Sequence, residues 1–179
     1  MSKAILPQES PGEPAGLAAS VPGLREAGHR YITELGWSVF LERTRVVNGE
    51  IARTAIGNCE PCREADAAHD RETCECLTCH GFYAATRDET RWDALCDAVP
   101  DATHLCVRTG RASEIFVVDL DAKDNGPQIW HEWPQTHNWT PSTTLKQRTK
   151  SGGFHLFYGL PAGVEVGSHN RSSPAVGVK

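Results

Sequence analysis

Cysteine density is the feature that most constrains this chain of 179 residues. Five of its seven cysteines fall within the 21 residues from position 59 to position 79, in a polar segment. Four of them form the pairs Cys59-x2-Cys62 and Cys76-x2-Cys79, with thirteen residues between the pairs. Such pairs let two sulfurs turn back onto one ion, and zinc prefers four such ligands in a tetrahedron. The sequence therefore predicts a structural zinc site in an insertion over residues 57–80.

More ligand-type side chains lie in this segment than one zinc ion uses. Cys74, His69 and His80 are spare candidates, and Cys74 or His80 can substitute for a member of the four-cysteine set. The odd cysteine count argues against a disulfide framework. Cys96 and Cys106 lie in apolar surroundings, so we expect them to be ordinary core residues.

Charge is unevenly distributed along the chain. The formal net charge is −5, but the residues from position 142 onward carry five basic side chains against Glu165, which is +4 and leaves −9 on the first 141. An acidic body argues against a protein that coats nucleic acid through bulk charge. A local basic strip suits a channel for a phosphate-bearing ligand, although a solvated face is the simpler interpretation of charge alone.

Nothing in the sequence predicts a membrane segment or a secretory signal. No apolar stretch approaches the roughly 20 residues of a membrane helix. The N-terminus also lacks the continuous apolar core of a signal peptide. We therefore expect a soluble, intracellular protein.

Hydrophobic patterns and turn signals predict one domain that mixes helices and strands. We expect a flexible tail over residues 1–20 and a folded domain over residues 21–179. Residues 126–141, rich in tryptophan and interrupted by Pro134, resist assignment. Helices are expected over residues 24–35 and after Asp88, and strands or hairpins over 37–41, 44–54, 104–110, 114–122 and 143–161. Such a mixture indicates an α/β or α+β layer fold.

An apolar run ends at two aspartates, Asp119 and Asp121. Side chains alternate along a strand, so both carboxylates are expected on one face, roughly 6–7 Å apart at the backbone. Two like charges there are costly unless a divalent cation neutralises them. Hard oxygen ligands suit Mg²⁺ or Mn²⁺ that holds substrate phosphates for two-metal phosphoryl transfer. A strand end where carboxylates simply meet water is the alternative that two aspartates alone leave open.

A second motif, KSGGFH at residues 150–155, predicts a glycine turn that opens a strand. Paired glycines allow close backbone approach and turn successive N–H groups toward an anion. Lys150 adds positive charge, and His155 can hydrogen-bond a phosphate oxygen. An ordinary hairpin turn explains this motif when it is taken alone. Together with the two aspartates, it describes a metal-and-phosphate pocket.

These motifs carry a family resemblance. The chain resembles the archaeo-eukaryotic primase superfamily, and more narrowly the N-terminal domain of bifunctional DNA primase/polymerases (prim-pol) of actinobacterial viruses and plasmids. The resemblance runs from about residue 23 to the end and is carried by GWSVFL at 36–41, CHGFYAATRD at 79–88, VRTGRASEIFVVDLDAK at 107–123 and SGGFHLFYGLPAG at 151–163. The cysteine insertion resembles the zinc-binding elaboration of that group. Its ligands include a His before the Gly, which makes His80 a rival to one cysteine.

The resemblance implies template-directed nucleotide polymerisation by a prim-pol catalytic-type domain over residues 21–179. The implied fold is an RRM-like mixed β-sheet with flanking helices and with both active-site strands side by side. The implied catalytic residues are Asp119, Asp121 and His155, with the two aspartates holding metal ions between the triphosphate and the primer 3′-hydroxyl. The residues implied in nucleotide binding are Lys150, Ser151, Gly152, Gly153 and Arg148, with Lys146 as an alternative to Arg148.

The same resemblance implies cofactors and partners. The cofactors are Mg²⁺ or Mn²⁺ at a two-metal site and a structural Zn²⁺. The partners are a single-stranded DNA template, an NTP or dNTP, and a replicative helicase domain or protein, with no membrane. The expected location is the cytoplasm of a bacterial or phage-infected cell.

The chain departs from the family pattern at one point. The family carries a third metal-binding acid, typically in a Gly-Val-Asp stretch, where this chain reads Gly177-Val178-Lys179 and ends. A C-terminally truncated or minimal domain is therefore expected, and the spacing of Glu165 does not support it as a stand-in. The main alternative is a catalytically impaired nucleotide- and single-strand-binding zinc module of the same fold. Weaker alternatives are a purely structural zinc adaptor and a haloacid-dehalogenase-like phosphohydrolase, whose DxD motif continues with Gly-Thr rather than Ala122-Lys123.

Overall fold

The structure is a computed structural model that describes residues 21–64 and 69–167. The expected tail over residues 1–20 and the terminal Gly177-Val178-Lys179 lie outside the described residues. In chain order the elements are α1 (Val21–Leu35), β1 (Val39–Val47), β2 (Glu50–Ala55), α2 (Glu60–Glu64), η1 (Gly81–Ala84), α3 (Glu89–Ala98), β3 (His104–Val107), β4 (Ile115–Leu120), η2 (Ala122–Asp124), α4 (Gly126–His137), β5 (Leu145–Arg148) and β6 (Phe154–Gly159).

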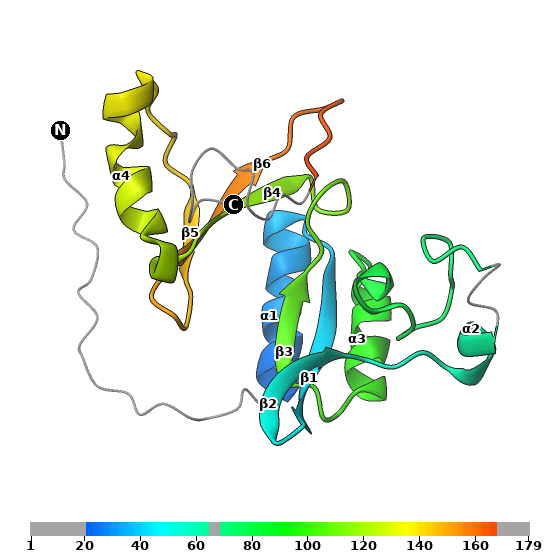
Figure 1. Cartoon of the computed structure of the whole chain (residues 1–179). Helices are drawn as coiled ribbons and strands as arrows, with labels where there is room; N and C mark the ends of the chain where they lie inside the picture. The colour runs from blue at the N-terminus through cyan, green and yellow to red at the C-terminus, as the bar shows by residue number, and fades with distance from the viewer. Residues whose placement is uncertain (1–20, 65–68, 168–179) are drawn as a thin grey trace.

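Two small antiparallel sheets carry the fold (Figure 1). The first has the strand order β2-β1-β3 and the second has the order β4-β6-β5. The mixed α/β character predicted from the sequence is confirmed. The strands that carry the two motifs, β4 and β6, lie side by side as expected. Every strand pairing of the described residues is antiparallel, so the single RRM-like mixed sheet stays a prediction.

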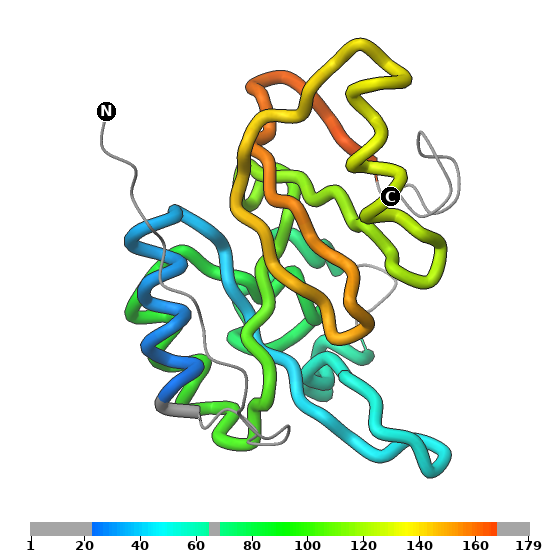
Figure 2. The backbone as a smooth tube through the Cα atoms, turned by 90° about the vertical axis from the view of Figure 1, so that its left-hand side faces the viewer, coloured from blue at the N-terminus to red at the C-terminus, as the bar shows by residue number. Residues whose placement is uncertain are grey.

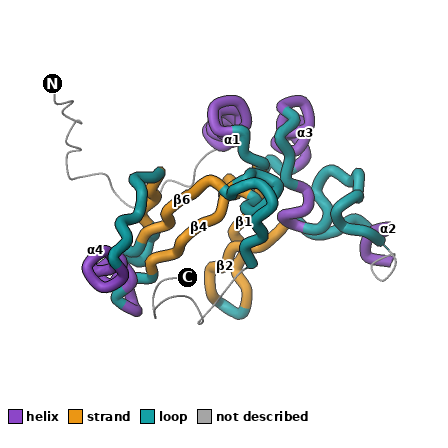
Figure 3. Tube along the Cα trace, turned by 90° about the horizontal axis from the view of Figure 1, so that it is seen from above, coloured by secondary structure: helices purple, strands orange, loops and turns teal. Residues whose placement is uncertain are grey.

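Helices α1 and α3 lie next to each other over the first sheet (Figure 3). Trp92 is fully buried between them, and its indole N–H donates to the carbonyl oxygen of Arg25 at 2.9 Å. A Cβ at Gly28 would lie 2.2 Å from the Trp92 ring. Glycine inside a helix costs about 1 kcal/mol, but here it allows the close approach that buries the indole. The core comprises Leu24, Ile32, Val39, Leu41, Trp92, Leu95, Cys96, Val99 and Ala102.

Local sequence signals account for most of these elements. Gly36 has a φ of +67° and ends α1, while Asn48 and Gly49 have positive φ in the turn from β1 to β2. Asp88 caps α3 by accepting the backbone N–H of Arg91 at 2.7 Å. The strand predicted over residues 37–41 continues to residue 47, because β1 pairs along that length with β2.

Helix α4 occupies the segment that resisted assignment. Pro127 lies in its first turn, where a missing N–H leaves no helical hydrogen bond unmade, and Pro134 lies inside the helix. The helix packs through Trp130 against the buried Leu120 and Leu156 of the second sheet. This packing against the sheet stabilises the helix, and a contribution from packing cannot be predicted from local helix propensity. Among the described helices, none is long and apolar enough to span a membrane.

Charged side chains join α1 to α3 at the surface. His29 lies between two carboxylates, with Nε2 2.9 Å from Asp93 Oδ1 and Nδ1 2.9 Å from Glu89 Oε2. Arg25 also pairs with Asp93 at 2.9 Å. The hydrogen bond with Asp93, followed by the one with Glu89, raises the pKa of His29 above its ordinary value of 6.5.

Replacing His29 with Gln is expected to destabilise the fold only at a pH where the folded protein holds this side chain charged. A pKa raised by folding gives its full stabilisation below the unfolded value of 6.5 and loses it as the pH rises through the folded pKa. We expect His29→Gln to lower Tm by roughly 2 °C at about pH 6 and by much less at about pH 9 in scanning calorimetry.

Arg30→Gln is the control for this prediction. It removes the exposed ion pair with Glu34 on the same helix, and arginine stays charged over the whole range. Its effect on Tm is expected to be nearly independent of pH. A loss for His29→Gln that is equal at both pH values would contradict the role given to the charged imidazole.

Candidate active site and cysteine cluster

The two sequence motifs meet where β4 pairs with β6. Asp119 and His155 are direct partners across the two strands, and His155 Nε2 lies 3.8 Å from Asp119 Oδ1. Partners in an antiparallel pair share one face of the sheet. The side chains are 39% and 41% exposed, respectively, so both are accessible to a ligand from solvent.

Asp121 lies one residue beyond the end of β4. Its carboxylate accepts the backbone N–H of Lys123 at 3.3 Å and lies 3.3 Å from Lys123 Nζ. Its carbonyl oxygen accepts the N–H of Gly126 at 2.9 Å. Asp121 therefore caps η2 and ties the start of α4 to the end of β4, while Asp119 stays within the strand.

Close approach explains the glycine pair of the second motif. A Cβ at Gly153 would lie 2.2 Å from the carbonyl oxygen of Leu120 and 3.1 Å from the backbone nitrogen of Ala122. Gly152 has a φ of +89°, a conformation that favours glycine. The turn therefore packs backbone to backbone against the segment that carries the two aspartates.

The turn itself is closed by short-range hydrogen bonds. Thr149 N–H donates to the carbonyl oxygen of Gly153 at 2.9 Å, and its own carbonyl accepts the N–H of Gly152 at 3.0 Å. Lys150 and Ser151 are exposed at its tip. The turn joins β5 to β6 (Figure 2, orange hairpin). The strand register places Lys150 and Ser151 at the same end of the sheet as Asp121.

Strand β5 gives the Asp119 face a side chain that the sequence analysis missed. Gln147 is the partner of His155 across β5 and β6, so it shares that face. Arg148 is the partner of Phe154, which packs under α4 on the opposite face. The nucleotide-binding role of Arg148 stays a prediction. Alternation along the strand would have singled out Gln147 only if the pairing of β5 with β6 had been known.

A hollow of about 400 Å³ lies between α4 and the second sheet. Its lining includes Trp130, Lys146 and Phe154, and Lys146 Nζ lies 5.1 Å from the centre of the Phe154 ring. The strand register puts this hollow on the face opposite Asp119 and His155. Lys146, the alternative to Arg148 in nucleotide binding, therefore lies on the face of the sheet opposite Asp119 and His155, as Arg148 does.

The two aspartates fit a divalent cation that takes further ligands from elsewhere. Within residues 21–64 and 69–167, Asp119 and Asp121 belong to no group of three or more mutually close ligand-type side chains. Mg²⁺ is commonly held by one or two carboxylates, with water and substrate phosphates completing its shell. Glu165 forms an ion pair with Arg111, so its carboxylate already has a cationic partner.

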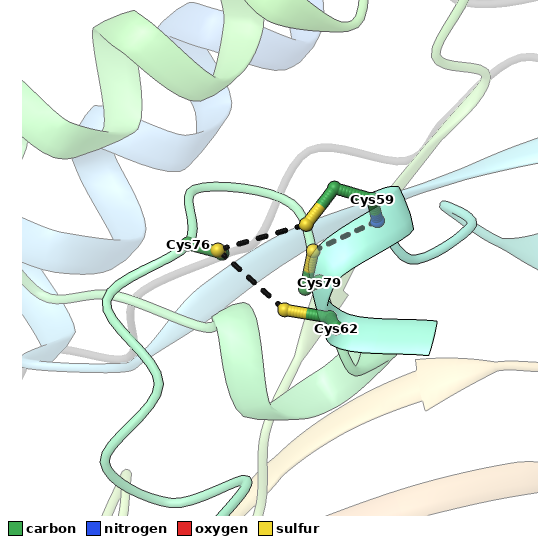
Figure 4. A group of neighbouring side chains, drawn as sticks. All are labelled: Cys59, Cys62, Cys76 and Cys79. Carbon is green, nitrogen blue, oxygen red and sulfur yellow. Dashed lines mark hydrogen bonds between the residues drawn. The ribbon is translucent and has the colours of Figure 1, made fainter. Parts of the chain in front are cut away.

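Four cysteine sulfurs meet beside α2 (Figure 4). The ligand atoms of Cys59, Cys62, Cys76 and Cys79 all lie within 4.8 Å of one another. The Sγ–Sγ distance is 3.8 Å from Cys59 to Cys76 and 3.6 Å from Cys62 to Cys76. A zinc tetrahedron with Zn–S bonds of about 2.3 Å has edges of about 3.8 Å. The structure thus brings together the predicted cysteines in an arrangement compatible with zinc.

Hydrogen bonds favour the thiolate at one member of this cluster. The backbone N–H of Cys62, together with the thiol of Cys79, lowers the pKa of Cys59 to about 7. Burial raises the pKa of Cys62. Zinc binds the thiolate, and a coordinated thiol loses its proton to the charge of the ion. The cluster therefore offers one sulfur that is ready to bind and one that the ion itself would deprotonate.

Arginines hold the cysteine segment to the rest of the domain. Arg91 of α3 donates to the carbonyl oxygen of Cys76 at 2.8 Å. Arg108 pairs with Glu72 at 2.7 Å and lies 4.7 Å from the ring centre of Tyr83. These contacts fix the segment against α3 and the loop after β3.

The chain belongs to a known family. Acidic and histidine side chains facing each other at a glycine turn are an arrangement compatible with a phosphate-bearing ligand. A family model for the bifunctional DNA primase/polymerase N-terminal domain matches residues 28–177, so this chain is a member of that family. Membership implies metal-dependent nucleotidyl transfer with DNA and nucleotide substrates at the level of the family. Comparison with curated proteins and with solved structures gives no match.

Gly153→Ala is expected to destabilise the second sheet, because the new methyl group would collide with the Leu120 carbonyl oxygen. Overpacking of this kind costs about 1–3 kcal/mol of unfolding free energy, which urea denaturation measures. Gly159→Ala, at the other end of β6, is the matched control because a Cβ there meets no atom within 4 Å. Equal stability of the two variants would contradict the close packing of the turn.

Proposed function

We propose that this protein is a DNA primase/polymerase that transfers nucleotides from NTPs or dNTPs onto a strand growing along a single-stranded DNA template. The observation that carries the proposal is Asp119 facing His155 at 3.8 Å across β4 and β6, in a chain of the prim-pol family. The resemblance suggests viral or plasmid replication as the setting. A helicase partner stays a prediction.

The proposed reaction relies on positioning. Divalent ions bound by Asp119 and Asp121 would supply charge stabilisation to the attacking and leaving oxygens. The pairing of β4 with β6 fixes Asp119, and the N–H of Lys123 orients Asp121. His155 offers Nε2 to a triphosphate oxygen beside Asp119. In nucleotidyl transfer the protein forms no covalent bond to the substrate in this scheme, so its contribution is to hold carboxylates and hydrogen-bond donors in fixed positions.

The glycine turn would hold the outer phosphates. Lys150 contributes charge and Ser151 a hydroxyl donor, and both are exposed at the tip. The turn lies against residues 120–122, which keeps phosphates near the carboxylate-bound ions. The resemblance implies the same task for Arg148 at the end of β5, although the strand register places Arg148 on the face opposite Asp119.

An aromatic pair beside the cysteine cluster, the exposed Phe82 and the half-buried Tyr83, suits a single-stranded template. Phe82 is 48% exposed and stacks on Tyr83 with ring centres 4.3 Å apart. Arg108 lies over both rings, at 5.4 Å and 4.7 Å from their centres. Aromatic faces and a guanidinium bind bases and phosphates without sequence preference. A structural zinc ion on the four cysteines would hold this platform in place.

The double substitution Asp119→Asn, Asp121→Asn is expected to abolish template-dependent synthesis. The change removes both negative charges that would hold divalent ions, so product formation should fall at least about 100-fold. The measurement is primer synthesis and extension on single-stranded DNA with Mn²⁺ and labelled nucleotides. Asp124→Asn, a nearby carboxylate in η2, is the control and should keep the wild-type rate.

Other outcomes of this assay separate the alternatives. Nucleotide binding without turnover in folded wild-type protein would favour the catalytically impaired binding module. Equal synthesis by the double variant and the wild type would contradict the assignment of the two aspartates. Phosphatase activity on a generic substrate would favour the phosphohydrolase.

His155→Asn is expected to weaken nucleotide binding while leaving the fold intact. Loss of a hydrogen bond to a charged phosphate costs about 1.5–3 kcal/mol, so Kd for a dNTP should rise roughly 10-fold to 100-fold. Fluorescence titration with a labelled dNTP measures it. His137→Asn, at the exposed C-terminal end of α4, is the matched control and should bind normally. An unchanged Kd in His155→Asn would remove His155 from the phosphate site.

A further inference from the structure

Three ligand-type side chains of the cysteine segment lie outside the four-cysteine cluster but against it. They are His69, Cys74 and His80. Their ligand atoms and the sulfur of Cys62 all lie within 4.8 Å of one another. Cys62 therefore belongs to two overlapping groups of four ligands, and its side chain is buried between them.

Distances within the second group match a zinc shell. The Cys62 sulfur lies 3.8 Å from the Cys74 sulfur and 3.8 Å from His69 Nε2. A tetrahedral ion with Zn–S of about 2.3 Å and Zn–N of about 2.05 Å has edges of about 3.8 Å between sulfurs and about 3.6 Å between sulfur and nitrogen. The spacing is thus that of ligands around one ion and is too wide for a disulfide.

His80 supplies an independent observation. Its side chain is buried, with 9% of the residue exposed, and its Nε2 has no hydrogen-bond partner among the described residues. Asn58 holds the residue from the other side, accepting the backbone N–H of His80 at 2.7 Å and contacting Nδ1 at 3.3 Å. A buried ring nitrogen without a partner costs free energy, which a bound cation would offset.

We propose that the cysteine segment binds two zinc ions rather than one. The second ion is held by Cys62, His69, Cys74 and His80, and the thiolate of Cys62 bridges it to the four-cysteine site. Sharing one thiolate lets all seven cysteine and histidine side chains of the segment complete two four-ligand shells. Five thiolates around two dications leave a net charge of −1, against −2 for an isolated four-cysteine site, which eases burial of the cluster.

One further feature agrees with a second ion. His80 directly precedes η1, which carries Phe82 and Tyr83. The second ion would therefore attach the aromatic pair of η1 to the cysteine segment through His80. The four-cysteine site alone reaches η1 only through Cys79.

Zinc content of the full-length protein tests the proposal, by native mass spectrometry and by elemental analysis. We expect two zinc ions per chain in the wild type and one in Cys74→Ser. His80→Asn should also hold one, because it removes the imidazole ligand of the second ion. Asparagine is chosen because it tolerates the left-handed backbone that His80 adopts at a φ of 63°. Cys106→Ser, a cysteine of β3 outside the segment, is the control and should keep two.

Cadmium substitution of the wild type gives a reading that needs no variant. Two ¹¹³Cd resonances, one from an all-sulfur site and one from a mixed sulfur and nitrogen site, with coupling through the shared sulfur, would support the bridged pair. A single resonance would overturn it, as would one zinc per wild-type chain or two zinc ions in Cys74→Ser. If Cys74→Ser fails to fold, the cadmium spectrum decides. None of these readings depends on polymerase activity, so failure of the proposed function leaves the test intact.

Discussion

The antiparallel pairing of β4 with β6 is the constraint on which the candidate active site depends. It fixes Asp119 opposite His155, although 35 residues separate them in the chain. Gly153 makes the pairing possible at that end, because any side chain there would meet the Leu120 carbonyl. A slip of one residue would turn His155 to the α4 side of the sheet. The site is therefore encoded as much by the register of the strands as by the residues it contains.

Prediction from sequence succeeds here where the physics is local. The Asn48-Gly49 turn and the Asp88 cap depend on neighbouring residues, and the knuckle spacing of the cysteines brings each pair together. It fails where distant packing decides. Helix α4 forms around Pro134 because its apolar side lies on the second sheet. Which side chains of β5 face Asp119 likewise depends on the pairing register of β5 with β6, which the sequence does not reveal.

Two kinds of metal chemistry are kept apart in this chain. The cysteine segment offers sulfur and imidazole nitrogen, which select zinc, whereas the strand end at Asp119 offers carboxylate oxygen, which suits Mg²⁺ or Mn²⁺. Soft ligands tied to α2 and α3 would therefore not compete for a hard ion held by the carboxylates of the second sheet.

The two hydrophobic cores are unequal, and the difference affects how the domain responds to substrate. Among residues 21–64 and 69–167, a cluster of nine buried residues supports α1, α3 and the first sheet, whereas the cluster beneath α4 has two, Leu120 and Leu156. Regions with little buried apolar surface open locally at low free-energy cost. A ligand that binds only the paired form of β4 and β6 would stabilise that pairing by mass action. Under the proposed function, ordering of the second sheet would therefore be part of nucleotide binding, and the better-packed first half would be its rigid base.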